Sequence, residues 1–178
     1  MTPELNHTRA GPGEGLVARN GSGIKTVTDL RGKKIGYLRG STAHFGLIMA
    51  LYQLGIPRDQ VTLISMTPAE QLAALASKAI DAAMVWEPWM QKMVHEADAR
   101  IIITEGEMGT YMAVTVYSAR RDWLRDNREA ALRYLRALLM AYEVLEKNPA
   151  IGIATLAKEM GIDETWSEVI FDHSPPGN

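Results

Sequence analysis

Along residues 16–103, short apolar runs alternate with segments whose apolar residues recur at helical spacing. Short apolar runs typical of β-strands occupy Leu16–Arg19, Lys34–Leu38, Val61–Met66, Ala82–Trp86 and Ile101–Ile103. Segments with apolar residues at helical spacing occupy Ala43–Leu54, Pro68–Lys78 and Pro88–Glu96. Strands that alternate with helices in this way predict right-handed βαβ units. We therefore expect an α/β fold built on a mainly parallel sheet with flanking helices.

The helix expected over Ala43–Leu54 is followed by Gly55 and Pro57, which is typical of a helix end. Its large apolar residues recur at helical spacing, so this face is expected to pack against the core. The residues of that face are Phe45, Ile48, Leu51, Tyr52 and Leu54.

The last third of the chain has a different pattern. Residues Met112–Tyr117 alternate like a strand, and the rest is almost entirely helical. Asp126 followed by Glu129 predicts the N-terminal cap of a long helix. The apolar face of that helix is formed by Leu132, Leu135, Leu138, Leu139, Tyr142 and Leu145.

Two further helices are expected near the C-terminus. Asn148 is expected to cap the first of them, with Pro149 at its first position and Gly161 at its end. Asp163 is expected to cap the second.

The composition is that of an ordinary globular protein. The 178 residues are 47% hydrophobic and 22% charged, and the formal net charge of −2 gives no basic field for nucleic acid. The absence of cysteine excludes disulfides, thiol catalysis and thiolate metal sites. Residues 1–15 lack the pattern of a signal peptide, so any export signal has been removed or was never present. No apolar run is long enough to span a bilayer.

Two expected helix starts differ in their chemistry. At Thr67-Pro68-Ala69-Glu70 the start is closed, which means that the helix itself satisfies its free main-chain N–H groups. Thr67 caps the helix, and Glu70 completes a capping box. At Gly40-Ser41-Thr42-Ala43-His44 no acidic residue occupies the first turn, and Arg39 is adjacent. Vacant main-chain N–H groups, two hydroxyls and the positive end of a helix dipole are the arrangement that an anion prefers.

Each of these residues also has a purely structural interpretation. A Gly-Ser-Thr junction is an ordinary N-cap, and His44 is either a donor to an anion or a satisfied helix residue. Trp86 and Trp89 at the end of a strand either wall a cleft or belong to the core, and Glu87 is too isolated to be assigned as an acid or base.

Three segments in series resemble a known family. Asp29–Gly36 followed by Gly40–Phe45 is similar to the "DLKGKK…GSSAHF" stretch of the sulfonate-, nitrate- and taurine-binding proteins of ABC importers, the SsuA-like and NMT1-like proteins. Gly13–Arg19 resembles the strand that precedes it, and Asp81–Trp89 resembles the family's "DA…WEP" segment. Order and spacing agree across residues 13–170.

The resemblance implies a type II periplasmic-binding-protein fold, with two α/β lobes around a cleft. In that fold, residues 1–15 are an irregular lead-in, 16–32 an inter-lobe crossover and 33–105 lobe two. Residues 106–117 are the return crossover, and 118–178 are the helical remainder of lobe one.

The resemblance also implies a function. The chain is expected to capture a small anionic solute without transforming it and without a cofactor or metal, outside the cytoplasm, and to deliver it to a membrane permease. The implied ligand-binding residues are Gly40, Ser41, Thr42, Ala43, His44, Trp86 and Glu87.

One departure from the family concerns lobe one. The family has an N-terminal βα segment there, whereas about fifteen irregular residues precede Leu16 in this chain. The C-terminal helices would then expose apolar faces, which usually mark an interface. We therefore expect association, for which a homodimer through these helices is the simplest form.

Three alternative functions remain open at this point. The first is an enzyme on the same fold, resembling thiamine-pyrimidine synthases, although the histidines show no paired ligand spacing. The second is the effector-sensing domain of a transcription regulator, which would need a helix-turn-helix, and residues 1–30 cannot form one. The third is a structural or interaction module.

Overall fold

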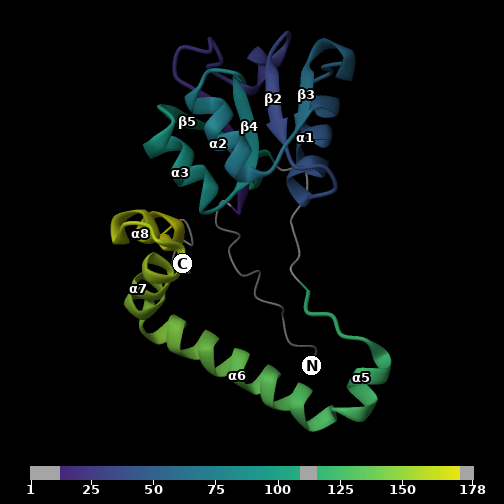
Figure 1. Ribbon diagram of the computed structural model, residues 1–178, viewed down its shortest axis with the longest axis vertical. Coiled ribbons are helices and arrows are strands. Elements are labelled where there is room, and N and C mark those ends of the chain that lie inside the picture. Colours follow the sequence, from purple (N-terminus) through teal and green to yellow (C-terminus); the bar gives the residue numbers. More distant parts are fainter. Residues whose placement is uncertain (1–12, 109–115, 173–178) are drawn as a thin grey trace. The chain divides into compact units, whose positions relative to one another are not determined.

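The computed structural model describes residues 13–108 and 116–172. The chain divides into two compact units: unit 1 is Met1–Ala113 with His173–Asn178, and unit 2 is Val114–Asp172. Unit 1 contains a five-stranded sheet in the order β3-β2-β4-β1-β5 (Figure 1).

The strands of unit 1 are β1 (Glu14–Arg19), β2 (Lys34–Tyr37), β3 (Thr62–Ser65), β4 (Ala82–Trp86) and β5 (Ala99–Thr104). Its helices are α1 (Thr42–Gln53), α2 (Pro68–Ala76), α3 (Trp89–Glu96) and the short α4 (Glu105–Met108). Two 3-10 turns, η1 (Val27–Leu30) and η2 (Arg58–Gln60), precede β2 and β3.

The predicted α/β class is confirmed, with one addition. Strand β2 pairs in parallel with β3 and β4, as βαβ units require. Strand β1 pairs antiparallel with both β4 and β5, so the sheet is mixed. β1 also begins at Glu14, ahead of the predicted start at Leu16.

Both faces of the sheet are buried, and consecutive strand residues alternate between two cores. On β4, Ala82 and Met84 join the cluster under α1, whereas Ala83 and Val85 join the cluster under α2 and α3. Figure 1 shows the same division, with α1 on one face and α2 and α3 on the other. A strand that is buried on both faces reads as a continuous apolar run, which is why β4 was predicted with its observed bounds.

Helix α1 packs through a different face from the predicted one. Phe45 is 53% exposed and Tyr52 is 79% exposed, so the predicted apolar face is wrong at these positions. The buried face instead follows strict helical spacing: Ala43, Gly46, Leu47, Ala50 and Leu51. Small residues on that face allow the helix to approach the sheet closely, and a reading based on large apolar residues overlooks them.

Asp81 has a structural role in the "DA" motif. Its Oδ1 pairs with the Arg19 guanidinium at 3.3 Å, and its Oδ2 accepts a hydrogen bond from the main-chain N–H of Lys34 at 2.9 Å. One carboxylate therefore links the end of β1 to the start of β2.

Unit 2 is helical over α5 (Arg121–Asp126), α6 (Arg128–Lys147), α7 (Pro149–Met160) and α8 (Glu164–Asp172). The predicted cap at Asp126 is wrong, because Asp126 ends α5 and pairs with Arg125, and Asn127 is the N-cap of α6. The strand predicted over Met112–Tyr117 lies largely outside the described residues, and its described part, Val116 and Tyr117, is not in a strand.

The other helix ends of unit 2 agree with the sequence. Asn148 is the N-cap position of α7 and Pro149 its first residue, although the Asn148 side chain makes no capping hydrogen bond. Gly161 ends α7 in the left-handed conformation, with φ of 60°. Asp163 precedes α8, and its Oδ1 accepts a hydrogen bond from the main-chain N–H of Thr165 at 2.8 Å.

Apolar side chains are exposed along α6, as predicted. None of its residues is buried, and Leu139 and Met140 are 64% and 66% exposed. Between α6 and α7 an apolar groove of about 570 Å³ is lined by residues that include Met140, Val144, Ile151 and Leu156. Within the described ranges, no helix has the length and apolar character needed to cross a membrane.

Candidate functional site

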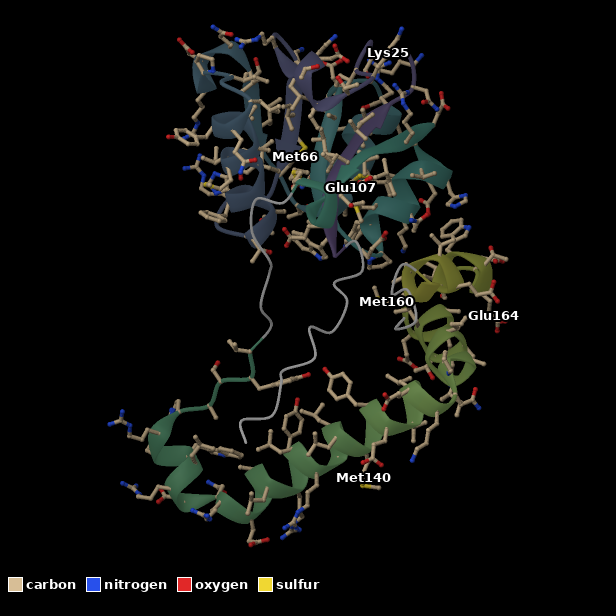
Figure 2. All side chains as sticks on the ribbon, turned by 180° about the vertical axis from the view of Figure 1, so that it is seen from behind. Lys25, Met66, Glu107, Met140, Met160 and Glu164 are labelled. Carbon is tan, nitrogen blue, oxygen red and sulfur yellow. The ribbon has the colours of Figure 1, made fainter. Side chains whose placement is uncertain are left out.

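One edge of the sheet in unit 1 collects the predicted site residues. The carboxyl ends of β2, β3, β4 and β5 lie at this edge, together with the first residue of β1, because Glu14 is paired with Trp86 and Gly15 with Thr104. Helices α1, α2 and α3 begin there. In Figure 2, Glu107 is labelled on this side of unit 1 and Lys25 on the opposite side. Open α/β sheets bind their ligands at such an edge.

The start of α2 is closed, as predicted. Glu70 accepts hydrogen bonds from the main-chain N–H of Thr67 at 2.7 Å and from its hydroxyl at 2.8 Å, and Thr67 Oγ1 accepts from the N–H of Glu70. These hydrogen bonds lower the pKa of Glu70 below its usual value, because they stabilise the ionised carboxylate.

The start of α1 differs from the predicted row of vacant donors. Ser41 is the N-cap, and its Oγ accepts from the main-chain N–H of His44 at 3.1 Å while it donates to the Leu38 carbonyl at 2.8 Å. The main-chain N–H of Gly40 donates to Nδ1 of His44 at 3.3 Å, and that of Ser41 donates to Leu38 at 3.3 Å. The prediction of vacant donors is therefore wrong for Gly40, Ser41 and His44, because the serine acts as an ordinary cap.

Two residues of the first turn remain. Ala43 is fully buried, so its N–H lies beneath the helix start, away from solvent. Thr42 is exposed, and its hydroxyl donates a hydrogen bond to a carboxylate oxygen of Glu14. The part of the predicted contrast that holds is charge, because the first turn of α1 contains no acidic residue and that of α2 contains Glu70.

The surroundings of His44 at this helix start disfavour its protonated form. Burial, followed by the charges of Arg58 and Arg39, lowers the pKa of His44 below its usual value of 6.5. Its ring lies 4.6 Å from the Tyr37 ring, centroid to centroid. Because Nδ1 accepts the Gly40 N–H, the neutral ring carries its proton on Nε2. Nε2 is buried and has no hydrogen-bond partner among the described residues.

A buried carboxylate that the sequence analysis missed lies beside α1. Glu14 is 5% exposed, and it contacts Thr42 across 28 positions of the chain. The sequence analysis placed Glu14 in an irregular lead-in, since a contact between such distant positions leaves no local pattern. No capping residue or other short motif in the sequence marks the contact between Glu14 and Thr42.

Trp86 and Glu87 are engaged within unit 1. Trp86 is half-buried and packs against both core clusters. Glu87 accepts hydrogen bonds from the main-chain N–H of Gln91 at 3.3 Å and from its Nε2 at 3.2 Å, which ties the carboxylate to the start of α3. The two residues therefore lie at the same edge as the α1 start. Across residues 13–108 and 116–172, no group of three or more His, Asp or Glu side chains is placed to hold a metal ion.

The sequence of this chain is similar to that of several known proteins. A sequence model described as the NMT1-like family matches residues 14–158. An Escherichia coli K12 protein named for aliphatic sulfonate binding is 31% identical over 163 residues, which cover 90% of this chain and 50% of that protein. The taurine-binding periplasmic protein of the same organism is 28% identical over 165 residues, covering 88% of this chain and 50% of that protein.

A solved structure gives the same result at the level of the fold. The alkanesulfonate-binding protein SsuA from Xanthomonas axonopodis pv. citri, bound to MOPS, has a TM-score of 0.78 and 26% sequence identity to this chain. The match covers 93% of this chain and 57% of SsuA. The chain thus spans about half the length of the curated relatives that it matches.

Proposed function

The chain belongs to the NMT1-like family, and from this premise we propose that it is the solute-binding component of an ABC importer. In this proposal it captures a small anionic solute, such as a sulfonate, taurine or nitrate, and leaves the solute chemically unchanged. The relatives named for sulfonate and taurine binding support the proposal. Because the chain spans about half of their length, the activity of a whole relative is itself part of the proposal.

The observation that carries the proposal is the charge at the start of α1. The positive end of its dipole points to the carboxyl edge of the sheet, where no acidic residue of its own first turn neutralises it. Burial is the largest cause of the lowered pKa of His44, and the charges of Arg58 and Arg39 lower it further. An oxyanion at this edge would be attracted by the helix end and by Arg39, which directly precedes Gly40.

We infer separate roles for the residues around the bound anion. Ser41 and Thr42 border it, and their hydroxyls donate to it once they turn away from their acceptors in the unliganded chain, the Leu38 carbonyl and the Glu14 carboxylate. The Gly40 backbone allows its close approach, since Gly40 has φ of 82° and open space where a Cβ would stand. The main chain of Ala43 contributes the end of the helix dipole. His44 lies beside the helix start with its Nε2 buried, whereas Trp86 at the end of β4 and Glu87 directly after it border the site.

The partners follow from the same proposal. The loaded protein acts outside the cytoplasm and passes its solute to a membrane permease. We also propose that the chain associates as a homodimer through the exposed apolar face of α6, which includes Leu139 and Met140. A single monomeric species in sedimentation at high protein concentration would contradict the homodimer.

The test of solute capture is a thermal-shift panel of nitrate, ethanesulfonate and taurine, with chloride as the control for ionic strength. A solute present at 100 times its dissociation constant stabilises the native state by about 2.7 kcal/mol, which raises the melting temperature by several degrees. We expect at least one of the three solutes to give this shift. No shift with any of them would contradict the proposed function.

The location of the site is tested with Ser41→Glu, which places a fixed carboxylate at the start of α1. We expect this variant to lose the shift, because its carboxylate occupies the position of the anion and repels it. Gln53→Glu adds the same charge at the far, exposed end of the same helix and should keep the shift. Each shift is measured from the melting temperature of the unliganded variant. An unchanged response in Ser41→Glu would remove the α1 start from the site.

A further inference from the structure

The apolar side chains of α6 fall on two sides of the helix. On one side, Met140, Val144 and Leu145 line the groove against α7. On the other side, four apolar residues follow one another at spacings of three, four and three positions: Leu132, Leu135, Leu139 and Tyr142. We call these four residues the α6 seam. Leu132 is half-buried and the other three are exposed, so the rest of unit 2 over residues 116–172 leaves most of the seam uncovered.

The spacing of the seam is that of a two-stranded coiled coil. Apolar residues at alternating intervals of three and four positions form a stripe along a helix, and such a stripe packs against the same stripe of a second helix. The 20 residues of α6 form one uninterrupted helix (Figure 1), so the seam is held straight before any partner arrives. Its shape therefore fits another helix of the same kind.

The charged residues at the two ends of the seam indicate which helix fits. At the same spacing, Arg128 comes four positions before Leu132 and Glu146 four positions after Tyr142, and both charged residues are exposed. When a second copy of α6 lies antiparallel along the seam, Arg128 faces Glu146 of that copy at both ends. In a parallel pair, Arg128 would face Arg128 and Glu146 would face Glu146, and like charges disfavour that arrangement.

One register satisfies the whole seam in the antiparallel pair. The facing pairs are Arg128 with Glu146, Leu132 with Tyr142, and Leu135 with Leu139, and all three are centred on Ala137. A two-fold axis beside Ala137 therefore brings apolar residues against apolar residues and each arginine against a glutamate. The seam is complementary to itself in charge as well as in spacing.

We propose that the α6 seam is the interface of an antiparallel homodimer, in which two copies of α6 form a short coiled coil. This inference rests on the homodimer of the proposed function and narrows it to one side of α6 and one orientation. Leu139 lies in the contact, whereas Met140 faces the groove against α7. Solute capture does not enter the argument.

The position of the contact is tested by sedimentation equilibrium of the full chain with Leu139→Glu and Met140→Glu. The two residues are neighbours on α6 and are exposed to almost the same degree, so both variants should keep the fold. We expect Leu139→Glu to raise the dissociation constant of the dimer about tenfold or more, because a carboxylate enters the apolar contact twice per dimer. Met140→Glu should stay within about threefold. Equal dissociation constants for the two variants would overturn the seam and leave a homodimer through another part of α6.

The orientation is tested with Arg128→Glu, alone and combined with Glu146→Arg, at low ionic strength, where exposed charges are least screened. A glutamate in the first turn and an arginine in the last turn both suit the helix dipole, so neither change should weaken α6 itself. We expect the single variant to raise the dissociation constant about tenfold, since two glutamates then meet at each end of the seam. The combined variant exchanges the two charges and should return to within about threefold of the original.

The control for net charge is Arg133→Glu, which makes the same change on an exposed part of α6 that is not in the seam and should stay within about threefold. An unweakened dimer in Arg128→Glu, or one that the combined variant does not restore, would overturn the antiparallel orientation. A chain that is monomeric at every concentration would overturn this inference together with the proposed homodimer. That result would leave solute capture standing, because the thermal-shift panel tests it separately.

Discussion

Replacement of Gly15 by valine is expected to lower the free energy of unfolding of unit 1 by about 3 kcal/mol or more. A Cβ at this position would lie 2.8 Å from the carbonyl oxygen of Ile103 and 2.8 Å from Sδ of the buried Met90. The carbonyl oxygen belongs to β5, which pairs with β1, so it cannot move without disturbing the sheet. Valine adds two further methyl groups to the same space.

The measurement is urea denaturation followed by tryptophan fluorescence, with Trp123 and Trp166 of unit 2 replaced by phenylalanine. The remaining tryptophans, Trp86 and Trp89, then report on unit 1 alone. Gly106→Val is the matched control, because nothing lies within 4 Å of a Cβ at Gly106. A loss in Gly15→Val no larger than in Gly106→Val would show that β1 and β5 are not packed as described.

Local signals in the sequence predicted the elements that depend on local chemistry. The bounds of β4 and the capping box at Thr67 and Glu70 are both confirmed. A capping box closes within four residues, and a strand buried on both faces is a continuous apolar run, so neither depends on distant parts of the chain. The end of α7 at Gly161 is predictable for the same reason.

The direction of β1 and the contact of Glu14 with Thr42 depend on pairing between residues that are far apart in the sequence. β1 lies between β4 and β5, which follow it by more than sixty residues in the chain. The residues of β1 show its strand character but contain no information on which strands it joins, or in which direction. Glu14 therefore reads as part of a Gly- and Pro-rich lead-in until the pairing of β1 is known.

The predicted site residues lie at one edge of the sheet, but the hydrogen bonds at the start of α1 differ from the predicted ones. The Gly-Ser-Thr junction at the start of α1 fits an anion site and an ordinary cap equally well, because both use a hydroxyl beside main-chain donors. Which of the two occurs depends on the side-chain rotamers of Ser41 and His44, and these rotamers satisfy two of the main-chain donors, those of Gly40 and His44. The absence of an acidic residue in the first turn of α1 followed from the sequence, whereas the Glu14 carboxylate beside Thr42 did not.

The packing of α1 leads to the second large effect, which is expected for Leu47→Ala. Leu47 is 1% exposed and lies in the core cluster between α1 and the sheet, together with Tyr37 and Met84. Truncation of a buried leucine to alanine removes apolar contacts and leaves a cavity, so we expect a loss of about 3 kcal/mol in the free energy of unfolding.

The control for Leu47→Ala is Tyr52→Ala on the same helix, because Tyr52 is 79% exposed and its loss should cost no more than about 0.5 kcal/mol. Urea denaturation with the unit 1 fluorescence reporters measures both variants. The comparison separates two interpretations of α1, since the predicted apolar face includes Tyr52 and the observed buried face includes Leu47. A larger loss for Tyr52→Ala than for Leu47→Ala would mean that α1 is rotated about its axis. The Thr42 hydroxyl would then face away from Glu14, and the proposed site would lose its geometry along with the packing.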